Sequence, residues 1–215
     1  SASGLLTSGA SMANFTALTV ARNANSGYDA RREGVLAAPG QLTAYASTEI
    51  HSCNQKALET LGLGSNGLRK VPVNDDYTID VDALREQVHA DREAGMVPFC
   101  VIATAGTINT GAIDDMEAIA DFCDEEGLWF HVDGAIGAVA VLADNVRPLL
   151  AGMDRADSIA LDLHKWMHIP FEAGCVIMRD APTHSDSFSL VPEYLQRDVD
   201  GGGMASGSLW FSDYG

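Results

Sequence analysis

Short apolar runs alternate with helix-period stretches along the middle of the chain. The clearest run is residues 97–104 (VPFCVIAT), which is apolar through most of its length and as long as a strand. A run of this kind is typical of a strand covered on both faces, so we expect it near the centre of a sheet. Shorter runs predict further strands at residues 43–47, 68–73, 128–132, 158–161 and 175–178.

Helices are predicted between these strands. Ala13, Ala17 and Ala21 recur at helical spacing and predict a helix over about residues 10–23. Further helices are expected over residues 54–61, after a cap at Asp80 or Asp82, and over residues 114–126, each followed by a glycine. The alternation indicates an α/β fold with a mainly parallel sheet flanked by helices.

The last part of the chain has a different character. From Ala181 onward Pro, Ser and Asp are frequent, and residues 201–203 are all glycine. We therefore expect one large domain over residues 1–180 and a loop-rich segment over residues 181–215. Both ends of the sequence look cut, because the first residues run directly into a predicted functional turn and the last ones stop within a pattern.

Composition excludes several classes of protein. The net charge of −17 over 215 residues disfavours DNA or RNA as a partner, since the field of the protein would repel phosphates. No apolar run is long enough to cross a bilayer, and no secretory signal is visible, so we expect a cytoplasmic protein. The four cysteines form no CxxC pair, and His164 and His168 lack the glutamate of a zinc motif, so no metal is expected.

The first candidate site is the turn of small residues 7–11 (TSGAS), which precedes a predicted helix. Backbone N–H groups in such a turn can reach a phosphate, and the helix N-terminus adds about half a positive charge. Ser11 would add a hydroxyl donor. Taken alone, the turn is more often a simple helix cap without a ligand.

Two more candidates stand at predicted strand ends, where ligands bind in open α/β sheets. Asp133 could hold a pyridine nitrogen protonated, and the small residues Gly134 and Ala135 leave room for a flat ring. Lys165, just past another strand, could form an imine with an aldehyde. Alone, Asp133 is as well explained as a cap and Lys165 better explained as a surface residue. In the order turn, aspartate, lysine, however, they point to a single site, with the last two about one βαβ unit apart.

The sequence resembles the fold-type I enzymes that depend on pyridoxal 5′-phosphate (PLP), specifically the group II decarboxylases related to aromatic-L-amino-acid decarboxylase. The matching motifs are the turn of residues 7–14, His51 within EIHS, residues 104–107 (TAGT), residues 131–133 (HVD) and residues 164–166 (HKW). Each motif is moderately specific, and all of them in this order are strongly so.

The resemblance implies a role for each of these motifs. Lys165 would carry the cofactor as a Schiff base, Asp133 would bond to its pyridine nitrogen, and His51 and Ala135 would sandwich the ring. Ser11 and the backbone at Ala10 would hold the phosphate, with Thr107 and His164 also at the cofactor. The implied reaction is decarboxylation of an L-amino acid, an aromatic one by the weak indication of Trp166, in a homodimer with the active site at the interface.

Two positions depart from the family pattern. Ile108 stands where relatives commonly carry a second threonine, and Asp162 where some carry a neutral polar residue near the phosphate, so this carboxylate needs a partner or must point away. The relatives are also longer: they have an N-terminal segment and a small C-terminal domain that this sequence lacks.

The resemblance leaves the exact activity open. Residues 200–207 resemble the mobile loop whose tyrosine returns a proton in the family, but neither Phe211 nor Tyr214 aligns securely with that tyrosine. A phenylalanine there would imply an aldehyde synthase. A glutamate-type decarboxylase is also compatible with the motifs, and so is a non-catalytic fragment or scaffold that keeps the fold.

Overall fold

The computed structural model describes residues 1–189, and its centre is a sheet of 7 strands in the order β1-β7-β6-β5-β4-β2-β3. The strands are β1 (Ser3–Thr7), β2 (Leu42–Ser47), β3 (Leu68–Val71), β4 (Val97–Thr104), β5 (Trp129–Asp133), β6 (Ser158–Asp162) and β7 (Gly174–Met178). Strands β2 to β6 pair in parallel, and β7 is antiparallel to both β6 and β1. The expected mainly parallel α/β sheet is confirmed.

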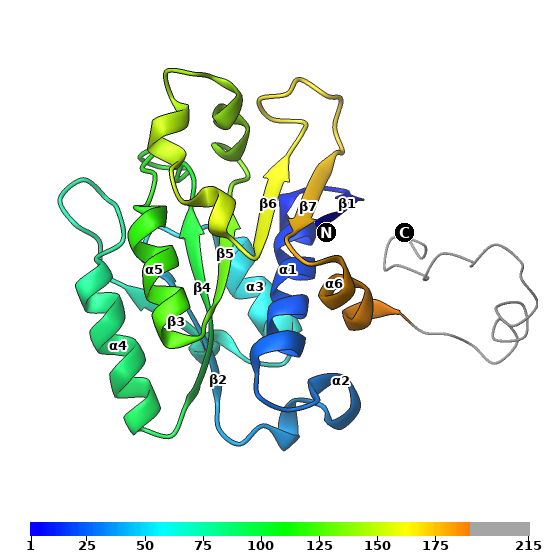
Figure 1. The fold of residues 1–215 in the computed structure, drawn as a ribbon, viewed down its shortest axis with the longest axis vertical. Coiled ribbons are helices and arrows are strands. Elements are labelled where there is room, and N and C mark those ends of the chain that lie inside the picture. Colours follow the sequence, from blue (N-terminus) through cyan, green and yellow to red (C-terminus); the bar gives the residue numbers. More distant parts are fainter. Residues whose placement is uncertain (190–215) are drawn as a thin grey trace, which may run out of the picture.

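Helices cover both faces of this sheet (Figure 1). They are α1 (Ala10–Asn25), α2 (Ala30–Glu33), α3 (Ser52–Thr60), α4 (Val81–Glu93), α5 (Met116–Glu126) and α6 (Ala181–Phe188). Buried side chains of α4 and α5, such as Leu84 and Phe122, share one core with β4 and β5. Those of α1 and α3, such as Leu18 and Leu58, pack on the opposite face. None of the helices within residues 1–189 has the length and hydropathy needed to cross a membrane.

Local chemistry explains where several helices begin and end. Asp80, one of two candidate caps, accepts a hydrogen bond from the Ala83 N–H at the start of α4. Asp115 does the same for α5, which ends at Gly127 in the left-handed conformation that glycine adopts without strain. The short 3-10 helices at residues 138–142, 147–150 and 153–155 lie between β5 and β6.

Two elements differ from the sequence-based expectation. Residues 3–7 were expected to lead directly into a turn, but they form β1, whose backbone pairs with β7 at the edge of the sheet. The segment expected to be loop-rich from residue 181 begins instead with α6, because Asp180 caps a helical turn with Pro182 in its first positions. The rest of that segment lies outside the described residues.

The sheet topology brings the candidate residues to one edge. The parallel strands β2, β4, β5 and β6 end there at Ser47, Thr104, Asp133 and Asp162. The register pairs Thr104 with Asp133 and places Ala160 beside Asp133 on the other side. Helix α1 begins at the same edge after the turn that follows β1, so a helix N-terminus faces the strand ends (Figure 1).

Candidate active site

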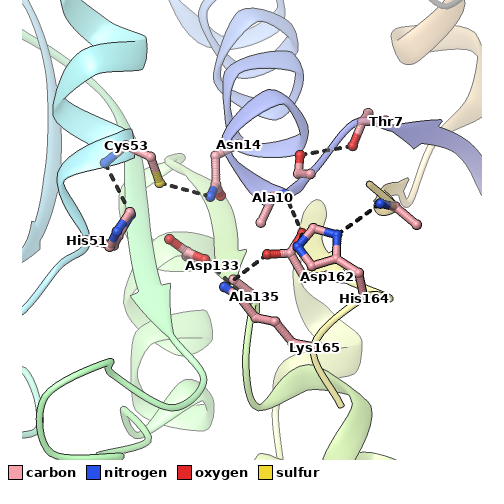
Figure 2. Close-up of polar contacts among 12 residues, drawn as sticks. Thr7, Ala10, Asn14, His51, Cys53, Asp133, Ala135, Asp162, His164 and Lys165 are labelled. Atoms are coloured by element: carbon pink, nitrogen blue, oxygen red, sulfur yellow. Dashed lines mark hydrogen bonds and ion pairs between the residues drawn. The ribbon is translucent and has the colours of Figure 1, made fainter. Parts of the chain in front are cut away.

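A cavity of about 250 Å³ opens at the carboxyl ends of the parallel strands. It is lined by every site residue that the sequence suggested: Ala10, Ser11, His51, Thr107, Asp133, Ala135, His164 and Lys165. These residues come from segments separated by up to about 150 positions of the chain, and the fold brings them to one place. Figure 2 shows Ala10, His51, Asp133, Ala135, His164 and Lys165 around this place.

Asp133 ends β5 and is 4% exposed. Its Oδ2 accepts a hydrogen bond of 2.6 Å from the Asn54 side-chain amide, and its Oδ1 accepts one of 3.3 Å from the Ala135 N–H. A buried carboxylate needs such donors to offset its lost hydration. The carboxylate is therefore held in place from two sides while it lines the cavity.

Lys165 and Asp162 form an ion pair in the wall of the cavity, with 2.9 Å between Nζ and Oδ2. The other oxygen of Asp162 accepts a hydrogen bond of 2.6 Å from the Ala10 N–H, at the first residue of α1. Figure 2 shows the carboxylate between the helix and the lysine. The departure noted at Asp162 thus has a physical answer, because this carboxylate is paired with an ammonium group and a helix N-terminus.

The same contact changes the expectation for Ala10. Its N–H was expected to face a phosphate, but here it donates to Asp162, the chain's own anion. Ser11 lines the cavity with an exposed side chain and remains a candidate phosphate donor.

The turn before α1 is packed tightly against β7. The Thr7 hydroxyl donates to the Gly9 carbonyl over 3.0 Å, which closes the turn. A Cβ added to Gly174 of β7 would lie only 2.6 Å from the Gly9 Cα, so no side chain fits there. Glycine at position 174 therefore lets the turn approach the sheet and places the start of α1 at the cavity.

Two histidines stand at the cavity rim. His51 caps α3, where its Nδ1 accepts a hydrogen bond of 3.3 Å from the Cys53 N–H. His164 Nδ1 accepts one of 2.9 Å from the Ala173 N–H, so in the neutral ring Nε2 carries the proton. That Nε2 lies 3.7 Å from Asp162 Oδ1, and the ring meets Phe171 edge-on.

A network of buried, hydrogen-bonded side chains lies beneath Asp133. His131 Nε2 is 2.7 Å from Asn14 Oδ1, and its Nδ1 is 2.8 Å from the Ser158 hydroxyl. Burial lowers the pKa of His131 to about 4, so the ring is neutral. Because Asn14 Oδ1 can only accept, the His131 proton sits on Nε2 and Ser158 donates to Nδ1.

Cys53 lies between this network of side chains and the cavity. Its Sγ accepts a hydrogen bond of 3.5 Å from the Asn14 amide. Burial, with a smaller effect of the Asp133 charge, raises the pKa of the Cys53 thiol to about 11. The thiol is thus protonated at neutral pH and is not a nucleophile there.

The loop after β4 forms another wall. Thr107 is buried, and its hydroxyl is 2.6 Å from that of Thr110. Ile108, the second departure from the family pattern, is 61% exposed at the cavity and offers only an apolar surface. The Thr104 hydroxyl is buried beside the cavity and has no hydrogen-bond partner within residues 1–189.

Sequence reasoning missed Asn54, which contacts the cavity residue Asp133, and two residues that line the cavity, Phe171 and Glu172. Asn54 was available to it, because it is a polar residue on the face of a predicted helix that also carries Ala57 and Leu58. Phe171 and Glu172 follow the lysine in an irregular segment, where no periodic signal exists. The glycine-rich stretch of residues 200–207, Phe211 and Tyr214 lie outside the described residues.

The sequence matches a known family over residues 1–206, the pyridoxal-dependent decarboxylase conserved domain. It is 41% identical to an aromatic-L-amino-acid decarboxylase of Bacillus atrophaeus over 196 residues, which cover 91% of this chain and 39% of that protein. It is 36% identical to the cysteine sulfinic acid decarboxylase of Mus musculus over 180 residues, 84% of this chain and 36% of that one.

Solved structures agree with these matches. The structure of Oryza sativa TDC with PLP and tryptamine superposes with a TM-score of 0.82 at 32% identity, over 95% of this chain and 42% of that one. The chain therefore spans about two fifths of the length of the proteins it matches.

Proposed function

Since the chain belongs to the pyridoxal-dependent decarboxylase family, whose cofactor is PLP, we propose that it forms the cofactor-binding part of an enzyme that decarboxylates an L-amino acid. The observation that carries this proposal is the pair of Lys165 and Asp133. An amine and a carboxylate from neighbouring strand ends line one cavity of about 250 Å³, which is a volume suited to a small flat cofactor.

The residues present fit this cofactor. PLP has an aldehyde, a pyridine nitrogen and a phosphate, and it needs an amine, an acid and an anion site. Lys165 would hold the aldehyde carbon, Asp133 the ring nitrogen, and Ser11 with the backbone of residues 8 and 9 the phosphate. The buried Thr104 hydroxyl, which lacks a partner within residues 1–189, supports the fit, because a polar ligand in the cavity would offset its lost hydration.

The residues of this chain would act mainly through charge and position. When bound, the cofactor supplies an electron sink for the electron pair that remains after CO₂ departs. Both carboxylate oxygens of Asp133 accept hydrogen bonds, so Asp133 can hold a proton on the ring nitrogen without moving. Ala135 leaves room for the ring on one side, and the exposed ring of His51 would cover the other.

Asp162 and His164 would control the lysine. In the present arrangement the Lys165 ammonium is held by Asp162, which in turn is anchored on the Ala10 N–H. Lys165 must leave this ion pair to bond to a carbonyl carbon. Asp162 then still has the Ala10 N–H and the neighbouring His164 as partners. The pair therefore gives the lysine a defined resting position.

We propose an aromatic L-amino acid as the substrate. The charged side chains that line the cavity, within the described residues, are the carboxylates Glu49, Asp133, Asp162 and Glu172 and the cation Lys165, and no arginine is among them. An acidic substrate side chain would meet repulsion there, whereas the apolar surfaces of Ile108 and Phe171 suit a ring.

Two further proposals concern the setting of the enzyme. The apolar side chains of Ile108, Trp166 and Phe171 are between 57% and 78% exposed at the cavity or next to it, which supports a homodimer with the active site at its interface. The cysteines of the chain are all unpaired, which supports a reducing compartment, the cytoplasm.

The test is a substrate panel with purified protein and added PLP. Aromatic, acidic and basic L-amino acids are supplied separately, and CO₂, amine and aldehyde are quantified. We expect CO₂ and amine from aromatic substrates and neither from the Lys165→Ala variant. Aldehyde in place of amine would indicate an aldehyde synthase, turnover of acidic substrates alone would reject the aromatic assignment, and PLP binding without turnover would favour the scaffold.

A further inference from the structure

Asn54 makes a short buried contact with the cavity carboxylate. Its Nδ2 donates a hydrogen bond of 2.6 Å to Asp133 Oδ2, although the two residues are 79 positions apart in the chain. Asn54 is 0% exposed, and Asp133 is 4% exposed. A hydrogen bond to a charged group away from water is among the stronger polar contacts in a protein.

The orientation of the Asn54 amide is set by this contact. If the amide were flipped, its carbonyl oxygen would face the Asp133 carboxylate, and two acceptors would repel each other. The observed orientation leaves Asn54 Oδ1 buried without a hydrogen-bond partner within residues 1–189. Such an orphaned carbonyl costs stability, so the fold accepts a penalty in order to point the donor at Asp133.

Packing alone would not call for an asparagine at this position. Asn54 is on the buried face of α3 together with Ala57 and Leu58, where an apolar side chain of similar volume would avoid the unsatisfied carbonyl. The neighbouring contacts of its Nδ2, the His51 carbonyl at 3.5 Å and Cys53 Sγ at 3.7 Å, are long and weak. The contact with Asp133 is therefore the one that accounts for the residue.

We propose that Asn54 is a positioning residue for Asp133, which it locks in the orientation that meets the ring nitrogen of the cofactor. Asn54 fixes Oδ2 and the Ala135 N–H fixes Oδ1, so the plane of the carboxylate cannot rotate. Without Asn54, Asp133 is held at one oxygen only. This inference rests on the proposed function, since it assigns to Asp133 the ring nitrogen as its partner.

The experiment compares PLP with an analogue in which a C–H group replaces the ring nitrogen. Dissociation constants for both are measured by absorbance titration with the wild-type protein and with Asn54→Leu, which keeps the branched shape of the side chain but lacks the donor. Gln55→Leu is the matched control, because Gln55 is the next residue of α3 and, within residues 1–189, its amide donates to Glu59 and not to a cavity residue. Thermal melting followed by circular dichroism checks that each variant is folded.

We expect Asn54→Leu to weaken PLP binding about tenfold, which is about 1.4 kcal/mol, and to leave binding of the analogue within about twofold of wild type. Gln55→Leu should match wild type for both ligands. Equal PLP affinity of Asn54→Leu and wild type would overturn the inference. An equal loss for PLP and the analogue would also overturn it, since that result would mean a general distortion of the cavity.

A second variant gives a separate test should Asn54→Leu fold poorly. Asn54→Asp has the same shape and places two carboxyl groups 2.6 Å apart, so they must share a proton. While that proton is present, the new carboxyl group can still donate to Asp133. The PLP affinity of this variant relative to wild type should therefore fall as pH rises, and a ratio independent of pH would contradict the inference.

The outcomes separate this inference from the proposed function. If wild-type protein does not bind PLP, the proposed function fails and takes the inference with it. If wild-type protein binds PLP and both Asn54 variants bind it equally well at every pH, only the role of Asn54 is refuted.

Discussion

Removing the charge of Lys165 should destabilise the cofactor-free protein, because it leaves Asp162 as a buried anion. The Asp162 side chain is 5% exposed and that of Lys165 is 37% exposed, so this pair lies between a surface and a buried ion pair. Exposed pairs contribute about 0–1 kcal/mol, and breaking fully buried ones costs about 3–5 kcal/mol. For Lys165→Met we expect a loss of about 2 kcal/mol, because Asp162 keeps its bond to Ala10.

Asp162→Asn supplies the matched comparison. The new amide oxygen can still accept from the Ala10 N–H, and the Lys165 ammonium can turn toward water, so we expect a smaller loss of about 1 kcal/mol. In the Asp162→Asn background the buried anion that pairs with Lys165 is gone, and Lys165→Met should then cost less than about 0.5 kcal/mol.

Urea unfolding of the wild-type protein, both single variants and the double variant, without cofactor at pH 7.5, measures this coupling. If Lys165→Met is as stable as wild type, or if it costs as much with Asp162→Asn as without it, the ion pair has no energetic role and the reasoning is refuted.

Three further predictions follow from buried groups and tight packing. The folded-state pKa of His131 is lowered to about 4, so its contribution to the free energy of unfolding is intact above about pH 6.5 and is lost as pH falls toward 4, by about 3 kcal/mol in all. The free energy of unfolding, measured with urea between pH 7.5 and 4.5, should therefore fall with pH, and it should fall less steeply in His131→Gln. An equal pH dependence of the two proteins would contradict this. Gly174→Ala should weaken PLP binding and cost about 1–3 kcal/mol, because its Cβ would lie 2.6 Å from the Gly9 Cα; Gly4→Ala, whose Cβ meets nothing closer than 3.4 Å, is the control and should behave as wild type. Cys53, with its pKa raised to about 11, should have about a thousandth of its thiol ionised at pH 8 and react slowly with iodoacetamide; peptide mapping that finds rapid labelling of Cys53 at that pH would refute the assignment.

The regular part of the fold could be predicted from the sequence because its signals are local. The apolar run at residues 97–104 matches β4 to the residue, since a strand buried on both faces is apolar along its length. Asp115 and Gly127 bound α5 as expected, because capping and the left-handed conformation depend on single residue types. Glycines 62, 64 and 67 have the spacing of a dinucleotide-binding pattern, but they follow α3 and lead through a three-residue 3-10 helix (Ser65–Gly67) into β3, so they do not open an α-helix.

The parts that could not be predicted depend on contacts between distant segments. Strand β1 has only five residues with no strong pattern, and its backbone pairing with β7 determines it. The sequence pattern of β7 does not reveal its direction either, because side chains alternate in the same way in parallel and antiparallel strands.

The candidate site divides in the same way. Asp133 and Lys165 could be found because both stand at predicted strand ends. The partners of Asp162 and the role proposed for Asn54 could not, because they require α1 and α3 to lie against β5 and β6. The expectation for Ala10 shows the limit most clearly, since a helix N-terminus accepts any nearby anion and here a carboxylate of the same chain competes for it.

The central claim is that Lys165 binds the aldehyde of PLP inside the cavity that Asp133 also lines. The direct measurement is to incubate the protein with PLP, reduce it with borohydride, digest it and locate the modified peptide by mass spectrometry. We predict one reduced pyridoxyl phosphate on Lys165, and none on Lys56 or Lys70. Label spread over several lysines, or absent from Lys165, would contradict the account.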